Sequence, residues 1–371
     1  MEPITFRRYL HRYPELSFEE YNTAKFISTA LEQQGIEHRS IAKTGILAKI
    51  EGRGDLRKAL VLRADIDALP VTENTGLPFA SRNEGVMHAC GHDMHAAVLY
   101  GVLMELNKSR DFEGTIFGIF QPGEERNPGG ASYVLAEKPF ADYDVTAVVG
   151  QHVEGQFEVG RLGFRAGKYM ASSDELRFTV NGVGGHGAMR HKIKDPVQAA
   201  SALLLELVDM NREDMVLSIG KVVADGATNV IPASVYLEGT MRTFDEAERA
   251  AIKVKIGEIC KAIETKYEGI HIDIDISHGF PCVVNDGELT QMAIELAATK
   301  YSVEQLDLRT TSEDFGFYTT RYPSLFYRLG AGPSPGSPHT STFCLDEGAI
   351  NVGIDFMLSI ARKITSYETK K

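Results

Sequence analysis

The stretch MHACGHDMHAA, residues 87–97, concentrates three histidines, one cysteine and one aspartate in a chain that has only four cysteines and eleven histidines in 371 residues. Cys90 and His92 lie two positions apart, so a loop or strand can turn both side chains toward one site. A thiolate and an imidazole form a ligand pair that suits zinc and similar divalent metals. A Cys-x-His pair is often simple packing, so a metal site needs further ligands.

Further candidate ligands stand where buried strands are expected to end. Glu124 and Glu125 follow an apolar strand in FQPGEER, His152 ends another in VVGQHV, and His339 lies in GSPHTSTF near the C-terminus. Sites in α/β proteins gather at the carboxyl ends of strands. Adjacent carboxylates point in different directions, so one can bind a metal while its neighbour acts on a water. Taken singly, these residues also fit a surface acid pair, a core histidine and a loop histidine.

Hydrophobic patterning predicts the elements that would position these side chains. A helix is expected at 21–34 and another at 96–106, because apolar residues recur there at helical spacing. Apolar runs that predict buried strands lie between them and after them, at 46–52, 59–67, 114–122 and 145–153. Helices alternating with buried strands indicate a three-layer α/β domain.

A self-contained block from about Ser172 to Ser277 has a different pattern. Its elements follow the order β-α-β-β-α-β, which is the split βαβ arrangement of ferredoxin-like folds, with strands at 174–182, 215–223, 234–243 and 270–277 and helices at 195–211 and 245–267. The chain then resumes its α/β character. We therefore predict a discontinuous catalytic domain of residues 1–170 and 281–371, and an inserted α+β domain of residues 171–280.

Composition excludes several classes of protein. The formal net charge is −12, which argues against a nucleic-acid surface. No run of eighteen apolar residues and no secretory apolar segment occurs, so we expect a cytoplasmic protein that does not enter a membrane. Four cysteines are too few for a disulfide framework in a chain of this length, so we expect reduced thiols.

Several motifs together give the chain a family resemblance. The sequence resembles metallopeptidase family M20, in the amidohydrolase branch with aminoacylases, hippurate hydrolases, N-acetyldiaminopimelate deacetylases and auxin-conjugate hydrolases. The matching stretches run in family order over nearly the whole chain: RRYLHRYPELSFEE, RADIDALPV, MHACGHDMHAA, FQPGEE, GQHV, GGHGAMRH, TNVIPASVYLEGTMRTF, TSEDFGF and SPHTSTF. The resemblance implies a zinc-exopeptidase-like catalytic domain, with the inserted domain acting as a lid and dimerisation domain.

The resemblance also implies roles for individual residues. It makes five residues the ligands of two divalent metal ions: Cys90, His92, Glu125, His152 and His339. Zinc is the first expectation from the thiolate and imidazoles, while manganese, cobalt or nickel could serve. A water shared by two cations becomes more acidic, and Glu124 would take its proton as the catalytic base. We assign Asp67 to orienting a ligand imidazole, with a structural turn as the alternative.

The implied substrate is an N-acyl amino acid, bound with the help of the inserted domain. His186 would stabilise the oxyanion and would reach across a homodimer to the other subunit's site. Asn229 and Arg242 resemble positions that hold the substrate's free carboxylate, which the fork of an arginine binds well. Sequence does not indicate whether the acyl group is acetyl, benzoyl, indolylacetyl or succinyl.

One segment departs from the family pattern. Where many relatives have proline before the second histidine of this loop, the chain has Arg190, followed by Lys192 and Lys194. Positive charge near the presumed substrate entrance leads us to the hypothesis that substrates with an extra carboxylate are favoured. The alternative is a solvated cationic loop.

Two other functions are compatible with parts of the sequence. GVGGHG, residues 182–187, fits G-x-G-x-x-G and would suggest a dinucleotide-dependent oxidoreductase. That motif requires a helix that opens at the loop, but AMRHKIKDP intervenes and no helix can start before about Asp195. A non-catalytic metal-binding homologue is disfavoured because all five ligands and Glu124 are present.

Overall fold

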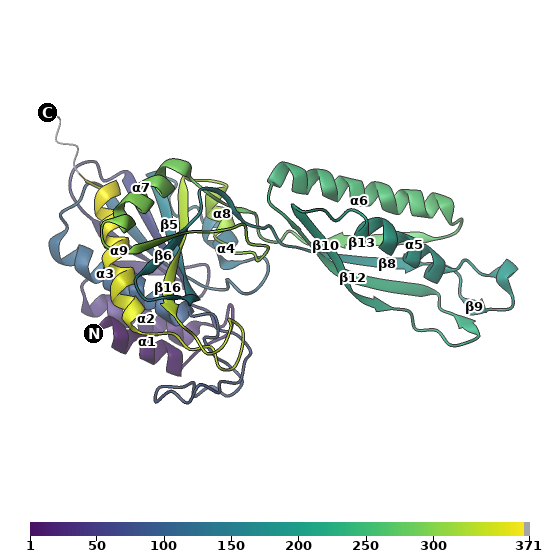
Figure 1. Cartoon of the computed structure of the whole chain (residues 1–371), viewed down its shortest axis with the longest axis horizontal. Coiled ribbons are helices and arrows are strands. Elements are labelled where there is room, and N and C mark those ends of the chain that lie inside the picture. Colours follow the sequence, from purple (N-terminus) through teal and green to yellow (C-terminus); the bar gives the residue numbers. More distant parts are fainter. Residues whose placement is uncertain (367–371) are drawn as a thin grey trace. The chain divides into compact units, whose positions relative to one another are not determined.

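The computed structural model describes residues 1–366 and divides the chain into two compact units (Figure 1). Unit 1 comprises Met1–Tyr169, Val283–Asp307 and the chain from Asp314 onward. Unit 2 comprises Met170–Cys282 and the short segment Leu308–Glu313, which the sequence analysis had placed in the first domain. Among the described residues, no helix is both long enough and apolar enough to cross a bilayer.

Unit 1 is built on an eight-stranded mixed sheet with the order β1-β2-β4-β3-β5-β16-β6-β15. Its strands are β1 Glu37–Ile41, β2 Gly45–Glu51, β3 Lys58–Asp65, β4 Thr115–Gln121, β5 Asp144–Glu158, β6 Arg161–Phe164, β15 Ser302–Gln305 and β16 Ser324–Gly332. The central strands β4, β3, β5 and β16 are parallel. Every residue of β4 and β16 is buried, as expected for parallel strands that are covered on both faces. A further short pair joins β7 Gly167–Met170 to β14 Val283–Asn285.

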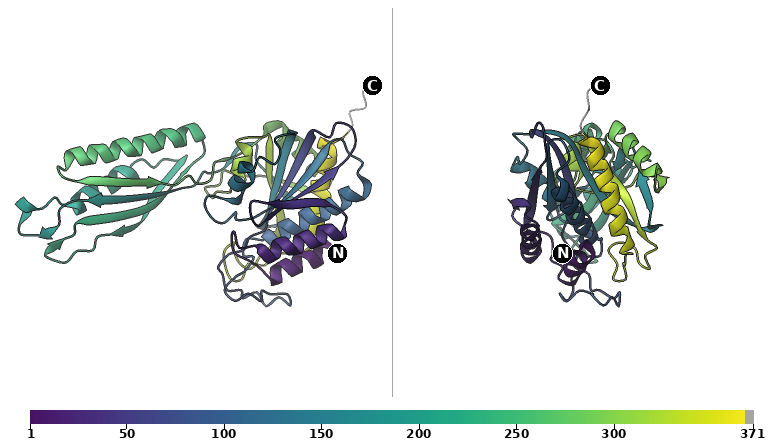
Figure 2. Two further views of the ribbon diagram at one scale, coloured as in Figure 1. Left: turned by 180° about the vertical axis from the view of Figure 1, so that it is seen from behind. Right: turned by 90° about the vertical axis from the view of Figure 1, so that its left-hand side faces the viewer.

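Helices cover both faces of this sheet. On one face, α3 His92–Ser109 packs against β3 between α1 Pro3–Arg12 and α9 Gly348–Ile364 (Figure 2). The approach of α3 to α9 is close, because a Cβ on Gly101 would lie 2.3 Å from Ile354. The same core includes side chains of α2 Tyr21–Gln33, and α7 Gly287–Ala298 contacts α9.

The opposite face is covered by shorter elements. On β16, Leu325 and Tyr327 join the core of α3, so Phe326 between them points to the other side. There it stacks on Phe315, with ring centroids 4.8 Å apart, at the start of α8 Gly316–Thr319. Helix α8 contacts α4 Gly130–Ala136, which lies on β4. The three-layer arrangement predicted from the sequence is therefore present.

Unit 2 has a four-stranded antiparallel sheet with the order β10-β12-β8-β13 and two helices. Its elements follow the predicted β-α-β-β-α-β order: β8 Asp174–Asn181, α5 Pro196–Val208, β10 Met215–Val223, β12 Ser234–Thr243, α6 Glu246–Lys266 and β13 His271–Ile276. Asp195 and Asp245 cap the two helices through their carboxylates. A two-stranded extension pairs β9 Gly185–His186 with β11 Val230–Ile231, and one 3-10 turn spans Arg190–Lys192.

Candidate metal centre

Three parallel strands of unit 1 bring the candidate site together. Asp65 at the end of β3 is in register with Gln121 at the end of β4, and β5 lies on the other side of β3. The chain beyond β3 carries Asp67, the chain beyond β4 carries Glu124 and Glu125, and β5 carries His152. The parallel strands therefore deliver their polar residues to one edge of the sheet.

The start of helix α3 and the loop before it contribute His92 and Cys90 to the site. Gly91 has a φ of 89°, a left-handed conformation that suits glycine, and α3 begins at the next residue, His92. The sequence analysis placed this helix start at Ala96. A side chain on Gly91 would also collide with Val153, because its Cβ would lie 2.6 Å from Val153 Cγ2.

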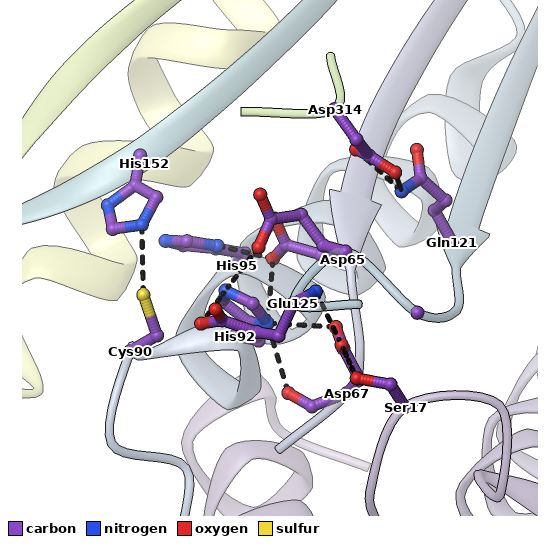
Figure 3. A network of polar contacts seen from close by, with 12 residues as sticks. Ser17, Asp65, Asp67, Cys90, His92, His95, Gln121, Glu125, His152 and Asp314 are labelled. Carbon is purple, nitrogen blue, oxygen red and sulfur yellow. Dashed lines mark hydrogen bonds and ion pairs between the residues drawn. The ribbon is translucent and has the colours of Figure 1, made fainter. Parts of the chain in front are cut away.

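All five predicted metal ligands meet in unit 1. The ligand atoms of Cys90, His92 and His152 lie within 4.8 Å of one another, and so do those of Cys90, Glu125 and His339. Cys90 Sγ is 3.3 Å from His152 Nε2, and His339 Nε2 is 3.2 Å from Glu125 Oε1. Figure 3 shows the contact between Cys90 and His152 as a dashed line, with His92 beside Cys90 and Glu125 close to the His92 ring.

Glu124 lies at the same cluster. His92 Nε2 is 4.0 Å from Glu124 Oε2 and 3.9 Å from Glu125 Oε1. Glu124 is 6% exposed, so its carboxylate lies largely out of bulk water. The carboxylates of both neighbouring acids therefore lie about equally close to one imidazole nitrogen.

Hydrogen bonds fix which nitrogen each candidate histidine ligand can offer. His92 Nδ1 is 3.0 Å from the Asp67 carbonyl oxygen and 3.1 Å from Asp67 Oδ1, and both of these oxygens can only accept. His152 Nδ1 donates to the Val153 carbonyl at 2.7 Å. In their neutral forms, His92 and His152 therefore keep a lone pair on Nε2, the nitrogen that faces Cys90 or the glutamates.

The donor set fits a divalent metal ion. His92 Nε2 is buried and has no hydrogen-bond partner among the residues that the structure describes. Burial lowers the pKa of His92, but the opposing effects of Asp65 and Cys90 are larger together. The pKa of His92 is therefore raised well above its usual value. The surroundings therefore favour positive charge at this nitrogen, which either a proton or a metal ion supplies.

Cys90, in contrast, would have to lose its proton to bind a metal. Burial, with a smaller contribution from Glu125, raises the pKa of the Cys90 thiol to about 12 in the absence of a cation. A metal ion beside the sulfur would favour the thiolate instead. His339 differs from the other candidate ligands because its side chain is half exposed, and the hydrogen bond to Glu125 raises its pKa.

Asp67 links three parts of the site. Its Oδ1 faces His92, while its Oδ2 accepts from Ser17 Oγ at 2.7 Å and from the Glu125 backbone N–H at 3.0 Å (Figure 3). Burial raises the pKa of Asp67, but these hydrogen bonds lower it more. The ionised carboxylate is thus placed to orient the His92 ring and the backbone of Glu125.

Sequence reasoning missed a second buried network behind the ligands. His95 donates from Nδ1 to Asp65 Oδ1 at 2.6 Å, and its Nε2 accepts from the Val153 backbone N–H at 2.9 Å. Both nitrogens of His95 are therefore occupied, and it offers no lone pair to a metal. Arg63 joins Asp65 and Asp314 at 2.7 Å each.

Charge compensation holds this network together. Burial raises the pKa of Asp65, but His92, His95 and Arg63 lower it well below its usual value. For Asp314 burial prevails, and its pKa is raised. One signal for the network was present in the sequence, since His95 follows His92 by three positions and shares its helix face.

The three predicted residues of unit 2 separate into two places. His186 on β9 is exposed and pairs with Val230, and Gly187 N–H donates to the carbonyl of the exposed Asn229 at 2.8 Å. Arg242 lies near the far end of β12, where its Nη1 donates to Ser312 Oγ at 2.7 Å and burial lowers its pKa.

The strand itself sets the distance between these places. Ser234, at the first end of β12, pairs with Asn181, which leads into the β9 segment. Arg242 is eight residues further along the strand, a span of about 26 Å at the usual rise per residue. The structure therefore brings His186 and Asn229 together and holds Arg242 apart from them.

Comparison with known proteins agrees with this geometry. The profile of "Peptidase family M20/M25/M40" matches residues 61–363. The chain belongs to this family. M20 membership confirms the family predicted from the sequence motifs, and with it the α/β fold class with an inserted domain and the class of amide-bond hydrolase.

Named M20 relatives cover nearly the whole chain. It is 36% identical to an N-acetyl-L-cysteine deacetylase of Bacillus subtilis, over 97% of this chain and 88% of that protein. It is 34% identical to an N-acetyldiaminopimelate deacetylase of Oceanobacillus iheyensis, over 97% of this chain and 98% of the relative. A solved structure from Bacillus subtilis, described as a dinuclear metal-binding peptidase of the M20 family, has a TM-score of 0.86 and 36% identity, and covers 98% of this chain and 97% of that one.

The glycine-rich motif of unit 2 has no dinucleotide-binding geometry in this M20 chain. After Gly187 the backbone forms the turn Arg190–Lys192, and α5 begins only at Pro196. No helix N-terminus follows the loop directly, as a pyrophosphate site of this kind requires. The oxidoreductase alternative is therefore rejected.

Proposed function

We propose that the protein hydrolyses the amide bond of N-acyl amino acids, releasing a carboxylic acid and a free amino acid. The observation that carries this proposal is the buried, unpartnered His92 Nε2 facing Glu124 and Glu125 beside Cys90. The names of the relatives support the substrate class, because they are deacetylases of N-acetylated amino acids.

Two divalent metal ions would be held by the five candidate ligands. Two of the three-residue groups in this region contain Cys90: Cys90, His92 and His152 would hold one ion, and Cys90, Glu125 and His339 would hold the other, because the ligand atoms of each group lie within 4.8 Å of one another. Zinc suits the sulfur and nitrogen donors best, and manganese, cobalt or nickel are the alternatives. When bound, such ions polarise an amide carbonyl and lower the pKa of water.

Glu124 would move the protons. Its largely buried carboxylate lies near His92 and Glu125 but outside the two three-residue groups that contain Cys90, so it can accept a proton from the attacking water and later donate it to the leaving amine. Asp67 would keep His92 in the tautomer that leaves Nε2 available. The chemistry thus divides between neighbouring glutamates, Glu125 for the metal and Glu124 for the proton.

Unit 2 would bind the rest of the substrate in a cytoplasmic homodimer. We assign His186 to the oxyanion, and Asn229 and Arg242 to the substrate carboxylate. A span of about 26 Å along β12 exceeds a small substrate, so one copy of unit 2 cannot offer both of its ends to one molecule. This supports the assignment of His186 and Asn229 to the site of a second copy.

The decisive experiment compares wild type with Glu124→Gln on a panel of N-acetyl, N-benzoyl and N-succinyl amino acids after metal loading. We expect kcat to fall by about 10²–10⁴-fold while the bound metal, measured by elemental analysis, stays at the wild-type level. The exposed residue Glu84 supplies a matched control, Glu84→Gln, which should retain full activity. A Glu124→Gln protein that keeps both its metal and its turnover contradicts the proposal, as does wild-type turnover that survives complete chelation.

A further inference from the structure

One of the pockets in unit 1 has no role in the proposed reaction. It has a volume of about 680 Å³ and lies beside the turn that carries Glu124 and Glu125. We call it the Phe18 pocket, and its lining includes Phe18, Ala42, Lys43, Arg126, Tyr133 and Glu137. None of the five candidate metal ligands lines it.

Backbone strain is concentrated around the Phe18 pocket. Six non-glycine residues in the described part of the chain have a positive φ, and three of them line this pocket: Phe18 at 65°, Ala42 at 48° and Lys43 at 70°. Side chains rarely adopt this conformation because it brings Cβ close to the backbone. Ala42 and Lys43 form the turn of the β1–β2 hairpin, where a positive φ is usual, whereas Phe18 lies outside such a hairpin, and strained residues of its kind occur at ligand sites.

Specific contacts hold the strained backbone in place. The Ala42 N–H donates to Glu137 Oε1 at 2.7 Å, and Lys43 Nζ lies 5.4 Å from the centre of the Tyr21 ring. The Phe18 ring lies so close to Gly123 that a Cβ there would be 2.3 Å from it. The pocket wall is therefore fixed before any ligand binds, which lowers the cost of binding.

The lining combines aromatic rings with cations. Phe18 and Tyr133 meet edge to face, with ring centroids 5.4 Å apart, and Tyr133 is 47% exposed. Arg126 is exposed and has no ion pair or side-chain hydrogen bond within the described residues. The pocket's own acid, Glu137, is engaged by the Ala42 N–H. An apolar wall beside an available guanidinium suits a small ligand with an apolar body and a carboxylate.

We propose that the Phe18 pocket is a binding site for small apolar or aromatic carboxylates, separate from the metal centre. The carboxylate pairs with Arg126 and Lys43, and the apolar body packs on Phe18 and Tyr133. Asp67 links the pocket to the candidate metal centre. It accepts hydrogen bonds from Ser17, which precedes Phe18, and from the backbone N–H of Glu125, which precedes Arg126. The carboxylic acid released by the proposed reaction belongs to this ligand class. Only this source of the ligand rests on the proposed function; the binding site itself does not.

The test is a titration of the whole protein with benzoate by calorimetry, in both metal-loaded and metal-free forms and without substrate. We expect saturable binding in both forms, weakened at least about tenfold by Arg126→Gln and by Tyr133→Ala. Tyr133→Phe keeps the ring and should retain binding, and Arg53→Gln, at an exposed arginine elsewhere in unit 1, is the matched control. Benzyl alcohol and acetate, which each lack one half of the ligand, should bind more weakly than benzoate.

Several results overturn the proposal. They are the absence of saturable benzoate binding to wild type, equal affinity in Arg126→Gln, or binding that appears only in the metal-loaded form. Circular dichroism of each variant shows whether it has kept its fold. Because the titration contains neither substrate nor turnover, an inactive enzyme that still binds benzoate would contradict the proposed function while supporting this site.

Discussion

At the scale of single residues, the site depends on carboxylates that act through their neighbours. Asp67 has no place in either three-residue group around Cys90, yet its two oxygens contact His92, Ser17 and the backbone of Glu125. A histidine whose ring is held by a carboxylate binds a metal ion more tightly. The carboxylate fixes the tautomer and the ring orientation, so binding the metal costs no further side-chain entropy.

Asp67→Asn tests this role directly. The carboxamide can place an N–H group against the donors of His92 or Glu125, so we expect metal affinity to fall by about 10–100-fold. Competition with a chromophoric chelator would measure that affinity, and Asp142→Asn, a change at a residue that contributes to none of these contacts, serves as the control. Unchanged metal affinity in Asp67→Asn would show that the His92 ring is positioned without the carboxylate.

The residue types of the site were predictable from the sequence, but their roles were not all predictable. His92 and His95 are both histidines on the first turn of one helix, and nothing in their spacing distinguishes them. They differ because the Val153 N–H of β5 donates to His95 Nε2, whereas His92 Nε2 has no such partner. That contact joins positions 58 residues apart, so spacing alone does not show which histidine is available to a metal, and the choice of His92 came from the family resemblance.

At the scale of elements, a buried ionic cluster joins the first strand of unit 2 to its long helix. Asp174 opens β8 and is fully buried, and it accepts from Arg249 Nε at 2.6 Å and from Lys253 Nζ at 2.7 Å, both on α6. Burial raises the pKa of Asp174, but the hydrogen bonds from Arg249 and Lys253 lower it more. The ionised form is therefore the one that stabilises the fold.

The pH dependence follows from the sign of that shift. The carboxyl binds its proton more weakly in the folded than in the unfolded chain, so its contribution is complete above the unfolded pKa and is lost as pH falls below about 4. We expect Asp174→Asn to destabilise unit 2 by about 3–5 kcal/mol at neutral pH, because it leaves buried cations unpaired. We also expect the variant to lose less stability than wild type between pH 5 and pH 3, a range set by the usual aspartate pKa of about 3.9.

Hydrogen exchange of the β8 and α6 amides would localise the effect of Asp174→Asn to unit 2, and urea unfolding followed by circular dichroism would give its size. Asp225→Asn, at an exposed loop position, should unfold like wild type at every pH. Equal pH dependence in Asp174→Asn and wild type would show that another group controls acid stability.

Element prediction succeeded where the hydrophobic period was strong. The alternating strand 270–277 and the capped helix 245–267 of unit 2 correspond to β13 and α6 within a few residues. The start of α3 was placed four residues late, because its first turn contains two histidines and the buried Asp93 rather than an apolar face. Short strands such as β6 and β15 were not predicted, since four residues carry too little periodic signal.

At the scale of the whole molecule, the cationic loop of unit 2 bears on substrate choice. Arg190 and Lys194 line a pocket of about 530 Å³ that also includes Gly187, the neighbour of His186. Lys194 lies 3.5 Å from Glu268, whereas Arg190 has no ion pair among the described residues. If His186 contacts the substrate, Arg190 is placed to meet an additional carboxylate on it.

We therefore expect N-acyl amino acids with an extra carboxylate to be favoured, and Arg190→Ala to lower their kcat/KM by about tenfold with little effect on neutral substrates. N-succinyl and N-butanoyl derivatives of one amino acid form a suitable pair. Lys221→Ala, at an exposed position of unit 2, is the charge-matched control. Equal turnover of the two substrates by wild type, unchanged in Arg190→Ala, would refute the hypothesis.

The separation of His186 from Arg242 within unit 2 leads to the last prediction, which concerns two copies of the chain. If His186 serves the metal centre of a partner, Glu124→Gln and His186→Ala are each inactive for different reasons and can complement one another. In a mixed dimer, one site combines an intact Glu124 with an intact His186, while the other site lacks both. Random pairing of equal amounts makes half of the dimers mixed, so we expect recovery of about a quarter of wild-type activity.

Dissociation and reassociation of the two inactive proteins, followed by an assay of amide hydrolysis, would measure that recovery. A mixture of either variant with itself is the control and should stay inactive. If His186 acted within its own chain, every site of every dimer would lack one of the two groups and no activity would return. A fully active His186→Ala protein would show instead that another donor stabilises the oxyanion, and sedimentation of wild type as a monomer would remove the partner on which the assignment depends.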